Sequence, residues 1–466
     1  MSLISRSLLP SLLLLAHSLN AQQFGSGKPE NAPEYKAPDE KNAGQFLALT
    51  IQKLKMGFDP PRPFRVWALG SSYTNMLGDG SFLQDGLTKK FPGCPPITYH
   101  KMVGNSVTWQ YLVGWARHLA IPDKPDLILI YTIGKPKDLD LLLTEIRRNC
   151  TAEIIVPSIH WRMRDAQNWG LSENAVDQDV PTVREICRRH RVEFVENRKH
   201  WAQYLQSNKL PLESLLKDAV HQSEYGAGII HANILAHFKA PDGDFHYSAR
   251  TRERKIKVNI NFEPGEPFHL PFRGNRVDLI AQRSPEGGLA KIFIDGKPGS
   301  DYPAFFASYM EPSSHNATAG KRQPPRDQGP HGITLLQGLV PQDWTIRMSS
   351  DKGDYTLSGS ITGKDGAGNS SKSFQSNSGQ ILIDPVFWRH PERNAKGDSF
   401  TFKVYRTTLG EISFAGKKEE TFRITLANAL TNDRHILRIV PDKEKAPMRI
   451  QSFEIFEPPL QETDQP

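Results

Sequence analysis

The chain has 466 residues, more than one hydrophobic core usually holds, so the length predicts at least two folded units. Hydrophobic residues make up 38% and charged residues 23%, which excludes wholesale disorder. The formal net charge of +7 comes without a long Lys/Arg block, so the sequence does not indicate binding to nucleic acid. A slightly basic surface accounts for it, and a weak attraction to acidic polymers stays open.

The N-terminus has the layout of a signal peptide over residues 1–21. A basic start at Met1–Arg6 precedes the apolar run Leu8–Leu15, which is too short to cross a bilayer, and small and polar residues follow up to Ala21. No cysteine follows the apolar run, so a lipoprotein anchor is not indicated, and no later segment has the composition of a membrane span. We therefore expect a secreted or periplasmic protein whose mature chain begins near Gln22.

Residues 22–63 are rich in Pro, Gly, Lys and Glu and predict an exposed lead-in, in which Gln45–Lys55 has the spacing of a short docked helix. Apolar strand-like runs then alternate with helical stretches through residues 64–240. The predicted strands are Phe64–Leu69, Ile97–Val103, Leu127–Ile133, Glu153–Val156 and Val192–Val195. The predicted helices are Trp109–Leu119, Leu139–Arg148, Val183–His190 and Lys199–Leu205. This alternation predicts an α/β domain with a parallel sheet covered on both faces.

The pattern changes over residues 245–460, where short strand-like runs are separated by Gly- and Asp-containing turns. These runs are Lys255–Asn261, Arg276–Ala281, Lys291–Ile294, Thr401–Val404, Thr421–Leu426 and Ile436–Val440. Such a series predicts an all-β sandwich or jelly roll. The polar stretch Met310–Gly332 is expected to be a long loop.

Two serines follow the first predicted strand at Gly70-Ser71-Ser72. In a parallel α/β sheet, this carboxyl end of a strand is where functional residues lie. A glycine permits a sharp turn there, and the turn would lift a serine hydroxyl beside backbone N–H groups that can stabilise an oxyanion. The alternative is an ordinary loop in which the serines cap a helix.

Asp218 and His221 lie three residues apart, just ahead of a predicted helix. At this spacing on a turn the carboxylate can reach back to the imidazole, hold its tautomer and stabilise the cation that forms on proton uptake. A helix-capping aspartate beside a surface histidine is the competing interpretation.

Together these blocks resemble the SGNH/GDSL hydrolases. Gly70-x-Ser72-x-Thr74 is similar to the opening block of that superfamily, and Asp218-x-x-His221 followed by Gly226 is similar to its last block. The resemblance covers about residues 64–238 and implies a three-layer, flavodoxin-like α/β fold. It also implies Ser72 as the nucleophile, His221 as the base and Asp218 as the support of His221.

The sequence departs from that family at two points. Ser71 stands where an aspartate usually precedes the nucleophile. The third block, usually Gly-x-Asn-Asp, is replaced by Gly134-Lys135-Pro136-Lys137, so the asparagine donor to the oxyanion is missing. Loss of one such donor costs roughly 3 kcal/mol in the transition state. The second block is best matched by Gly104, and the side-chain amide of Asn105 is the candidate substitute donor, unless the pair only forms a turn.

His160 and Trp161 follow another predicted strand, so we expect them to bind substrate, with Trp161 stacking on a sugar ring; a packed loop is the alternative. Cys94, Cys150 and Cys187 permit at most one disulfide, and their spacing does not indicate a metal site. Neither a cofactor nor a metal is expected.

The sequence therefore predicts an exported serine esterase or deacylase without a membrane span. Its substrate would be a small-molecule or polysaccharide ester, most simply an acylated carbohydrate. Hydrolysis of lipid or small esters is a second enzymatic interpretation. A glycan-binding protein with a degenerate hydrolase domain is the alternative from another class, and the missing third-block asparagine favours it.

Overall fold

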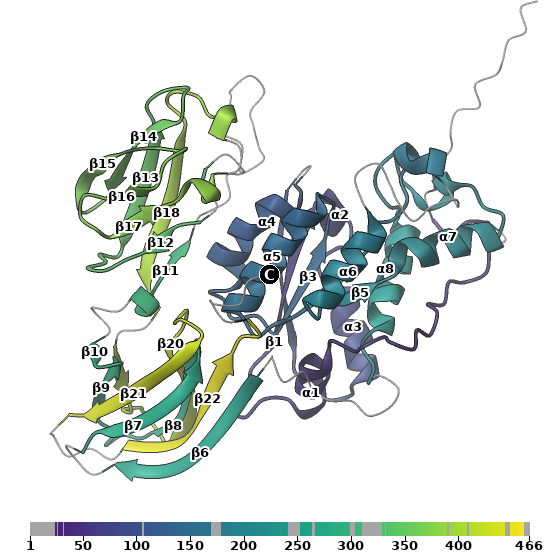
Figure 1. Cartoon of the computed structure of the whole chain (residues 1–466). Coiled ribbons are helices and arrows are strands. Elements are labelled where there is room, and N and C mark those ends of the chain that lie inside the picture. The colour runs from purple at the N-terminus through teal and green to yellow at the C-terminus, as the bar shows by residue number, and fades with distance from the viewer. Residues whose placement is uncertain are drawn as a thin grey trace, which may run out of the picture.

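A computed structural model describes most of the chain (Figure 1). The described residues are 24–25, 27–30, 32–104, 107–168, 179–240, 252–262, 266–298, 303–309, 329–330, 332–388, 391–407, 410–442 and 448–460. The predicted signal peptide, Asn105 and most of the predicted loop at 310–332 lie outside these ranges.

The first half of the chain forms an α/β domain around a five-stranded parallel sheet with the order β2-β1-β3-β4-β5. This is the flavodoxin-like strand order, so the predicted fold class is confirmed. The strands are β1 (Phe64–Ser71), β2 (Ile97–Gly104), β3 (Leu127–Tyr131), β4 (Glu153–Pro157) and β5 (Glu193–Val195). The helices are α1 (Ala48–Met56), α2 (Ser72–Asn75), α3 (Ser81–Lys90), α4 (Trp109–Trp115), α5 (Pro136–Asn149), α6 (Val180–Arg189), α7 (Asn197–Ser207) and α8 (Glu224–Ala236).

Strand β3 shows why the sheet has helices on both faces. All five of its side chains are buried, but they belong to two separate clusters. Leu127 and Leu129 pack on the side of α1, α3, α7 and α8, whereas Ile128 and Ile130 pack on the side of α4, α5 and α6. Because successive side chains of a strand point to opposite faces, an uninterrupted apolar run produces this three-layer arrangement.

The lead-in is docked on the domain along part of its length, which differs from the exposed segment that its composition predicts. The buried Glu153 carboxylate on β4 accepts hydrogen bonds from the N–H groups of Leu49 and Thr50 at 3.0 and 2.7 Å, at the start of α1. Glu193 on β5 does the same for Gly44 and Phe46. Two carboxylates at the sheet thus hold this segment through its backbone, which a reading of side-chain composition does not detect.

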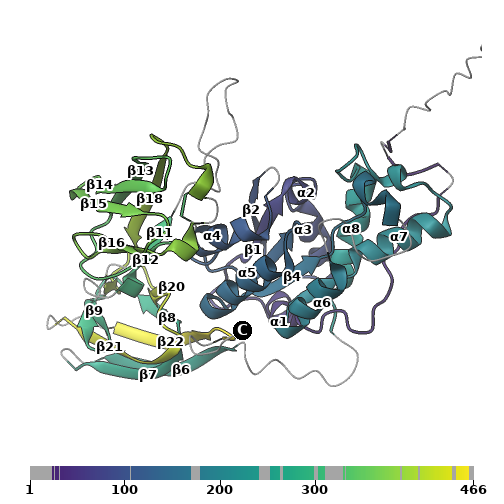
Figure 2. The same cartoon turned by 45° about the horizontal axis from the view of Figure 1, so that its top comes forward.

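Beyond residue 250 the described chain forms strands and short 3-10 turns, gathered in two lobes (Figures 1 and 2). In the first lobe, a sheet β10-β9-β21-β7, joined by β19, packs on a sheet β20-β8-β22-β6. Its strands are β6 (Arg252–Phe262), β7 (Phe268–Gly274), β8 (Arg276–Arg283), β9 (Leu289–Ile294), β10 (Lys297–Pro298), β19 (Glu411–Ser413), β20 (Glu420–Ala427), β21 (Asp433–Pro441) and β22 (Met448–Glu457).

The second lobe is inserted between β10 and β19, an arrangement that the expectation of one sandwich over 245–460 did not include. It contains the sheets β11-β18-β13-β14-β15 and β12-β17-β16. Its strands are β11 (Phe306–Tyr309), β12 (Thr334–Leu335), β13 (Gln342–Met348), β14 (Asp354–Gly359), β15 (Gly363–Asn369), β16 (Phe374–Gln375), β17 (Ile381–Ile383) and β18 (Ser399–Arg406).

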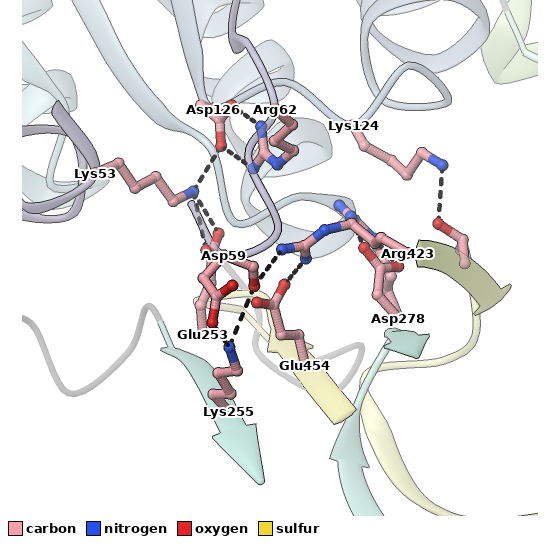
Figure 3. A network of polar contacts seen from close by, with 12 residues as sticks. Lys53, Asp59, Arg62, Lys124, Asp126, Glu253, Lys255, Asp278, Arg423 and Glu454 are labelled. Carbon is pink, nitrogen blue, oxygen red and sulfur yellow. Dashed lines mark hydrogen bonds and ion pairs between the residues drawn. The ribbon is translucent and has the colours of Figure 1, made fainter. Parts of the chain in front are cut away.

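A polar network joins the first lobe to the α/β domain at the amino-terminal ends of the parallel strands (Figure 3). Asp126, directly before β3, is 2% exposed and binds both Lys53 and Arg62. Lys53 also binds Glu253 on β6 at 2.9 Å. The network lies at the opposite ends of the strands from Ser72.

Cys94, Cys150 and Cys187 are free thiols in this structure. Across the described ranges, no helix combines the length and the apolar character that crossing a membrane would require.

Candidate active site

The turn at Ser72 is shaped by contacts of the glycine and the threonine that flank it. A Cβ on Gly70 would lie 2.1 Å from Thr74 Oγ1 and 2.5 Å from the Tyr131 carbonyl oxygen, so only glycine fits. Thr74 Oγ1 donates a hydrogen bond of 2.5 Å to that same carbonyl. The Gly-x-Ser-x-Thr pattern is therefore a packing unit that fixes the first turn of α2 against the end of β3.

Ser71 and Ser72 have different places in this turn. Ser71 is the last residue of β1, is 2% exposed, and its hydroxyl caps α2 by accepting a hydrogen bond from the Tyr73 N–H at 3.3 Å. Ser71 thus does the capping work that a serine or aspartate does at a helix N-terminus. Ser72 opens α2 and is partly exposed at the carboxyl end of the sheet.

Asp218 and His221 lie on a short loop whose backbone is closed by hydrogen bonds. The Lys217 N–H donates to the His221 carbonyl at 3.0 Å, and Leu216 pairs with Gln222. The Asp218 carboxylate accepts from the N–H groups of Val220 and His221, both at 2.8 Å. The carboxylate is therefore fixed by the backbone of its own loop.

The structure brings Ser72, His221 and Asp218 into one chain of contacts. His221 Nδ1 lies 3.0 Å from each carboxylate oxygen of Asp218, and His221 Nε2 lies 2.9 Å from Ser72 Oγ. Because an ionised carboxylate can only accept, Nδ1 carries the proton and Nε2 offers its lone pair to the Ser72 hydroxyl. The Asp218 and His221 side chains are 46% and 26% exposed, so the chain of contacts is open to solvent.

Asp218 remains ionised in this setting. Partial burial raises its pKa, but the hydrogen bonds from the backbone N–H groups of His221 and Val220 and from the His221 ring outweigh this, so the pKa lies below the usual range. The negative charge therefore persists at neutral pH, where it can support a proton on His221.

The oxyanion side of the site is described only in part. Gly104 is buried at the end of β2 and is directly paired with Ser71 in the parallel ladder, which places its backbone beside the turn at Ser72. Asn105 lies outside the described residues. At the third block, Lys135 is exposed and Pro136, the first residue of α5, has no N–H to donate.

His160 and Trp161 do not line the site, so the prediction that they bind substrate is wrong for this structure. They are 0% and 2% exposed and lie beneath the loop instead of facing solvent. The Trp161 indole N–H donates to the Arg198 carbonyl at 3.1 Å, and the Arg198 guanidinium stacks 3.5 Å from its ring. The Trp161 ring therefore offers no exposed face to a sugar, because the segment that follows β4 is buried.

His160 instead connects β3 to the loop that carries His221. Its Nε2 lies 3.0 Å from the Val220 carbonyl oxygen, and its Nδ1 lies 2.7 Å from the Tyr131 hydroxyl. Since a carbonyl can only accept, Nε2–H donates to Val220 and Nδ1 accepts from Tyr131. Burial lowers the pKa of His160 to about 3, so the ring stays neutral beside His221.

Sequence reasoning missed two residues that support the loop. Tyr131 ends the apolar run of β3, and its position at a strand's carboxyl end was the available signal. Gln222, next to His221, donates to the Tyr73 carbonyl at 2.9 Å and so ties the loop to α2. Nothing in its sequence context marked it. Within the described ranges, no group of His, Cys, Asp and Glu side chains is arranged to hold a metal ion.

No family model matches the sequence, and no curated protein matches it either. Solved structures that match this one include a two-domain esterase active on acetylated mannans, co-crystallised with mannopentaose. It is 10% identical, with a TM-score of 0.33, and the match covers 90% of this chain and 96% of that one. An acetylxylan esterase from Geobacillus stearothermophilus is 17% identical, with a TM-score of 0.33, over 42% of this chain and 99% of that one. Similarity at this level does not extend an activity to this chain, whose chemistry depends on its own site.

Proposed function

We propose that this protein is a serine hydrolase that cleaves ester groups, with Ser72 as nucleophile, His221 as general base and Asp218 as the residue that orients His221. The observation that carries the proposal is the 2.9 Å contact between His221 Nε2 and Ser72 Oγ, with Asp218 on the other side of the ring. A serine hydroxyl is a poor nucleophile at neutral pH and needs such an adjacent base.

The reaction would follow from this geometry in two halves. Ser72 Oγ attacks the ester carbonyl carbon as His221 Nε2 takes its proton, and Asp218 stabilises the resulting imidazolium. His221 then gives the proton to the leaving alcohol oxygen, which departs and leaves an acyl group on Ser72. In the second half, a water molecule gives a proton to His221 and attacks the acyl carbon; the bond to Ser72 Oγ then breaks, His221 returns the proton to Oγ, and the acid product leaves.

The negative charge on the tetrahedral intermediate needs donors close to Ser72. The backbone N–H groups of Ser72 and Gly104 are the proposed donors, since α2 begins at Ser72 and Gly104 lies beside Ser71 in the ladder. Asn105 remains the proposed third donor in place of the missing third-block asparagine. Lys135 becomes the next candidate if Asn105→Ala turns over an activated ester at the original rate.

An acylated carbohydrate is the proposed substrate class, and a secreted or periplasmic location is proposed with it. The signal-peptide layout and the attached β-rich lobes support this, because exported hydrolases with such lobes commonly act on glycans, an argument from architecture alone. The partly exposed position of the His221–Asp218 pair is compatible with a polymeric substrate.

A second candidate is a glycan-binding protein whose hydrolase domain is weakly active or inactive. The observation that favours it is the third block, where neither the exposed Lys135 nor Pro136 supplies the amide donor that the family uses. The intact contact between Ser72 and His221 argues against it.

Labelling with a fluorophosphonate separates the two candidates. The proposed hydrolase should be labelled stoichiometrically; Ser72→Ala should abolish labelling, and Ser71→Ala should preserve it. Release of acid from acetylated mannan and xylan, compared with p-nitrophenyl acetate and long-chain esters, would then identify the substrate class. A protein that is folded but not labelled would support the binding module instead.

A further inference from the structure

The sheet β10-β9-β21-β7 has an outer face on which side chains are exposed among the described residues. Along β7, β9 and β21 the side chains alternate between buried and exposed, and the buried set packs into the first lobe. In Figures 1 and 2 this sheet lies on the side of the lobe away from the α/β domain. We call its outward side chains the basic face: His269, Pro271, Arg273, Leu289, Lys291, Phe293, Glu411, Arg434, Ile436, Arg438 and Val440.

Basic side chains are placed opposite one another on the basic face. The register sets Arg434 directly opposite Arg273, and Arg438 directly opposite His269. Directly opposed like charges destabilise a sheet. Lys291 lies on the neighbouring strand β9, opposite Glu411, and the exposed Asp442, directly after β21, lies opposite Leu289. Among the described residues, the face therefore carries four permanent positive charges, against the carboxylates of Glu411 and Asp442.

The protein itself does little to neutralise these charges. Within the described residues, neither Arg434 nor Lys291 has a side-chain hydrogen bond or ion pair. Arg273 Nε lies 3.5 Å from Glu457 at the edge of the sheet. The Arg438 guanidinium lies 5.4 Å from the centre of the Phe293 ring, a contact that positions the cation without removing its charge.

The exposed side of the second lobe provides an internal comparison. In the sheet β11-β18-β13-β14-β15, Asp343 lies opposite Lys403 and Thr345 lies opposite Thr401. Arg347 on the same strand faces Ser399 and Thr356. There, opposite charges and hydroxyls face each other, which stabilises a sheet. The basic face is therefore a local departure and not a property of every sheet in this chain.

We propose that the basic face is a binding surface for an anionic polysaccharide, whose carboxylate or sulfate groups pair with Arg273, Arg434, Arg438 and Lys291. Outward residues of one strand recur roughly every 6.7 Å, so the cations form rows along which an extended chain can lie. Pro271, Ile436 and Phe293 stand between them and offer apolar contact to sugar rings.

The choice of a carbohydrate over other polyanions rests on the proposed function, since an enzyme that acts on acylated glycans gains from holding the polymer. Binding to single-stranded nucleic acid usually needs several stacking aromatic rings, and among the described residues of this face only Phe293 and the imidazole of His269 are rings. The surface would keep the enzyme on a charged matrix while Ser72 acts elsewhere on the molecule.

Affinity electrophoresis of the full chain carrying Ser72→Ala tests this without interference from hydrolysis. Polygalacturonate supplies carboxylates, dextran sulfate supplies sulfates, and neutral galactomannan is the uncharged reference. Arg434→Gln with Arg438→Gln should weaken binding to one or both anionic polymers about tenfold. The matched control, Arg347→Gln with Lys403→Gln, removes the same charge from the comparison sheet and should change binding by less than about twofold.

Several results would overturn the proposal: equal weakening by both double variants, equal retention by galactomannan, or no retention by either anionic polymer. Duplex DNA or anionic phospholipid vesicles binding as tightly through Arg434 and Arg438 would overturn the identity of the partner. The difference between polygalacturonate and dextran sulfate identifies the anionic group. Because binding is measured in the Ser72→Ala protein, a failure of the esterase proposal gives a separate result.

Discussion

Polar clusters made of similar groups lie at the two opposite ends of the strands in the parallel sheet, but the groups are arranged differently in each. At the amino edge, Asp126 is 2% exposed and is bound by both Lys53 and Arg62. At the carboxyl edge, Asp218 is 46% exposed, and its one basic side-chain partner, His221, is 26% exposed. The first cluster satisfies its own groups with protein partners, whereas the second leaves a ring nitrogen against a hydroxyl that can react.

Both carboxyls are kept ionised, but by different means. Burial alone would raise the pKa of Asp126, and the charges of Lys53 and Arg62 instead hold it well below its usual range. The pKa of Asp218 is lowered mainly by N–H groups of its own loop, against a desolvation that raises it. The buried cluster, whose charged groups are paired with one another, therefore joins the first lobe to the α/β domain. The more exposed cluster instead holds a histidine nitrogen against a serine hydroxyl, as the proposed reaction requires.

The largest expected effect comes from breaking the open cluster. His221→Ala removes the proposed base, so kcat should fall by roughly four to six orders of magnitude. The unfolding midpoint should stay close to that of the wild type, because the side chain is partly exposed. Initial rates on an activated ester, with a thermal melt of the same sample, measure both. An active variant with near-normal kcat would remove His221 from the mechanism.

Replacing each of the two aspartates by alanine should affect activity and stability in opposite orders. Asp126→Ala leaves Lys53 and Arg62 without their shared carboxylate and should cost about 3–5 kcal/mol of unfolding free energy. Asp218→Ala removes a loop cap and should cost about 1 kcal/mol. Conversely, kcat should fall roughly 10⁴-fold in Asp218→Ala, whereas in the folded fraction of Asp126→Ala it should stay within about threefold of the wild-type value. Denaturant titration and kinetics on both variants test this, and matching stabilities would contradict the distinction.

His160 sharpens the comparison because it is buried like Asp126 but lies under the open cluster. His160→Phe removes the donor to the Val220 carbonyl, so the loop carrying His221 should shift and kcat should fall roughly 10–100-fold with little change in KM. His160→Gln keeps an N–H at a similar reach and should recover part of the loss. If both variants lose activity equally and unfold earlier, His160 only supports packing.

The smallest expected effect concerns the cluster that holds the lead-in. Burial lowers the pKa of His237, but the hydrogen bond with Glu193 and the negative charges of Glu193 and of the nearby Glu40 outweigh this and raise it to about 9. A raised pKa means that this contribution to stability is fully present below the pKa of the unfolded chain and is lost as the pH rises through about 9. Melting temperatures between about pH 6 and pH 10 should therefore fall more steeply for wild type than for His237→Gln. Parallel curves would contradict the assignment.

The sequence was informative where one local pattern determined the structure. The apolar run of β3, buried on both faces, and the helical spacing in Leu139–Arg148 predicted their elements to within a few residues. Ser72, Asp218 and His221 were placed together because their blocks resemble known ones. The resemblance did not extend to the residues that support the site, because Tyr131 and His160 contact each other although they lie 29 residues apart in the chain.

The remaining features of the fold could not be predicted, because they depend on contacts between residues that lie far apart in the sequence. Glu153 and Glu193 bind backbone N–H groups of the lead-in, and such contacts leave no periodic trace in the segment that they hold. The division of the β-rich half into two lobes likewise depends on which distant strands pair. Neither β10 nor β19 carries a signal that chain segments more than 100 residues apart share one sheet through β9.

The insertion of one lobe into the other affects how the chain is made. In the first lobe, β22 lies between β8 and β6, and β21 lies between β9 and β7, so the strands that emerge first lack their central partners. Those partners arrive about 135 to 160 residues after β10, which at ribosomal speed is roughly seven to thirty seconds. Throughout that interval β6 to β10 present open edges, and the inserted lobe can fold while its host waits. A chaperone that shields strand edges would therefore matter most to this half of the nascent protein, long after the hydrolase-like half has left the ribosome.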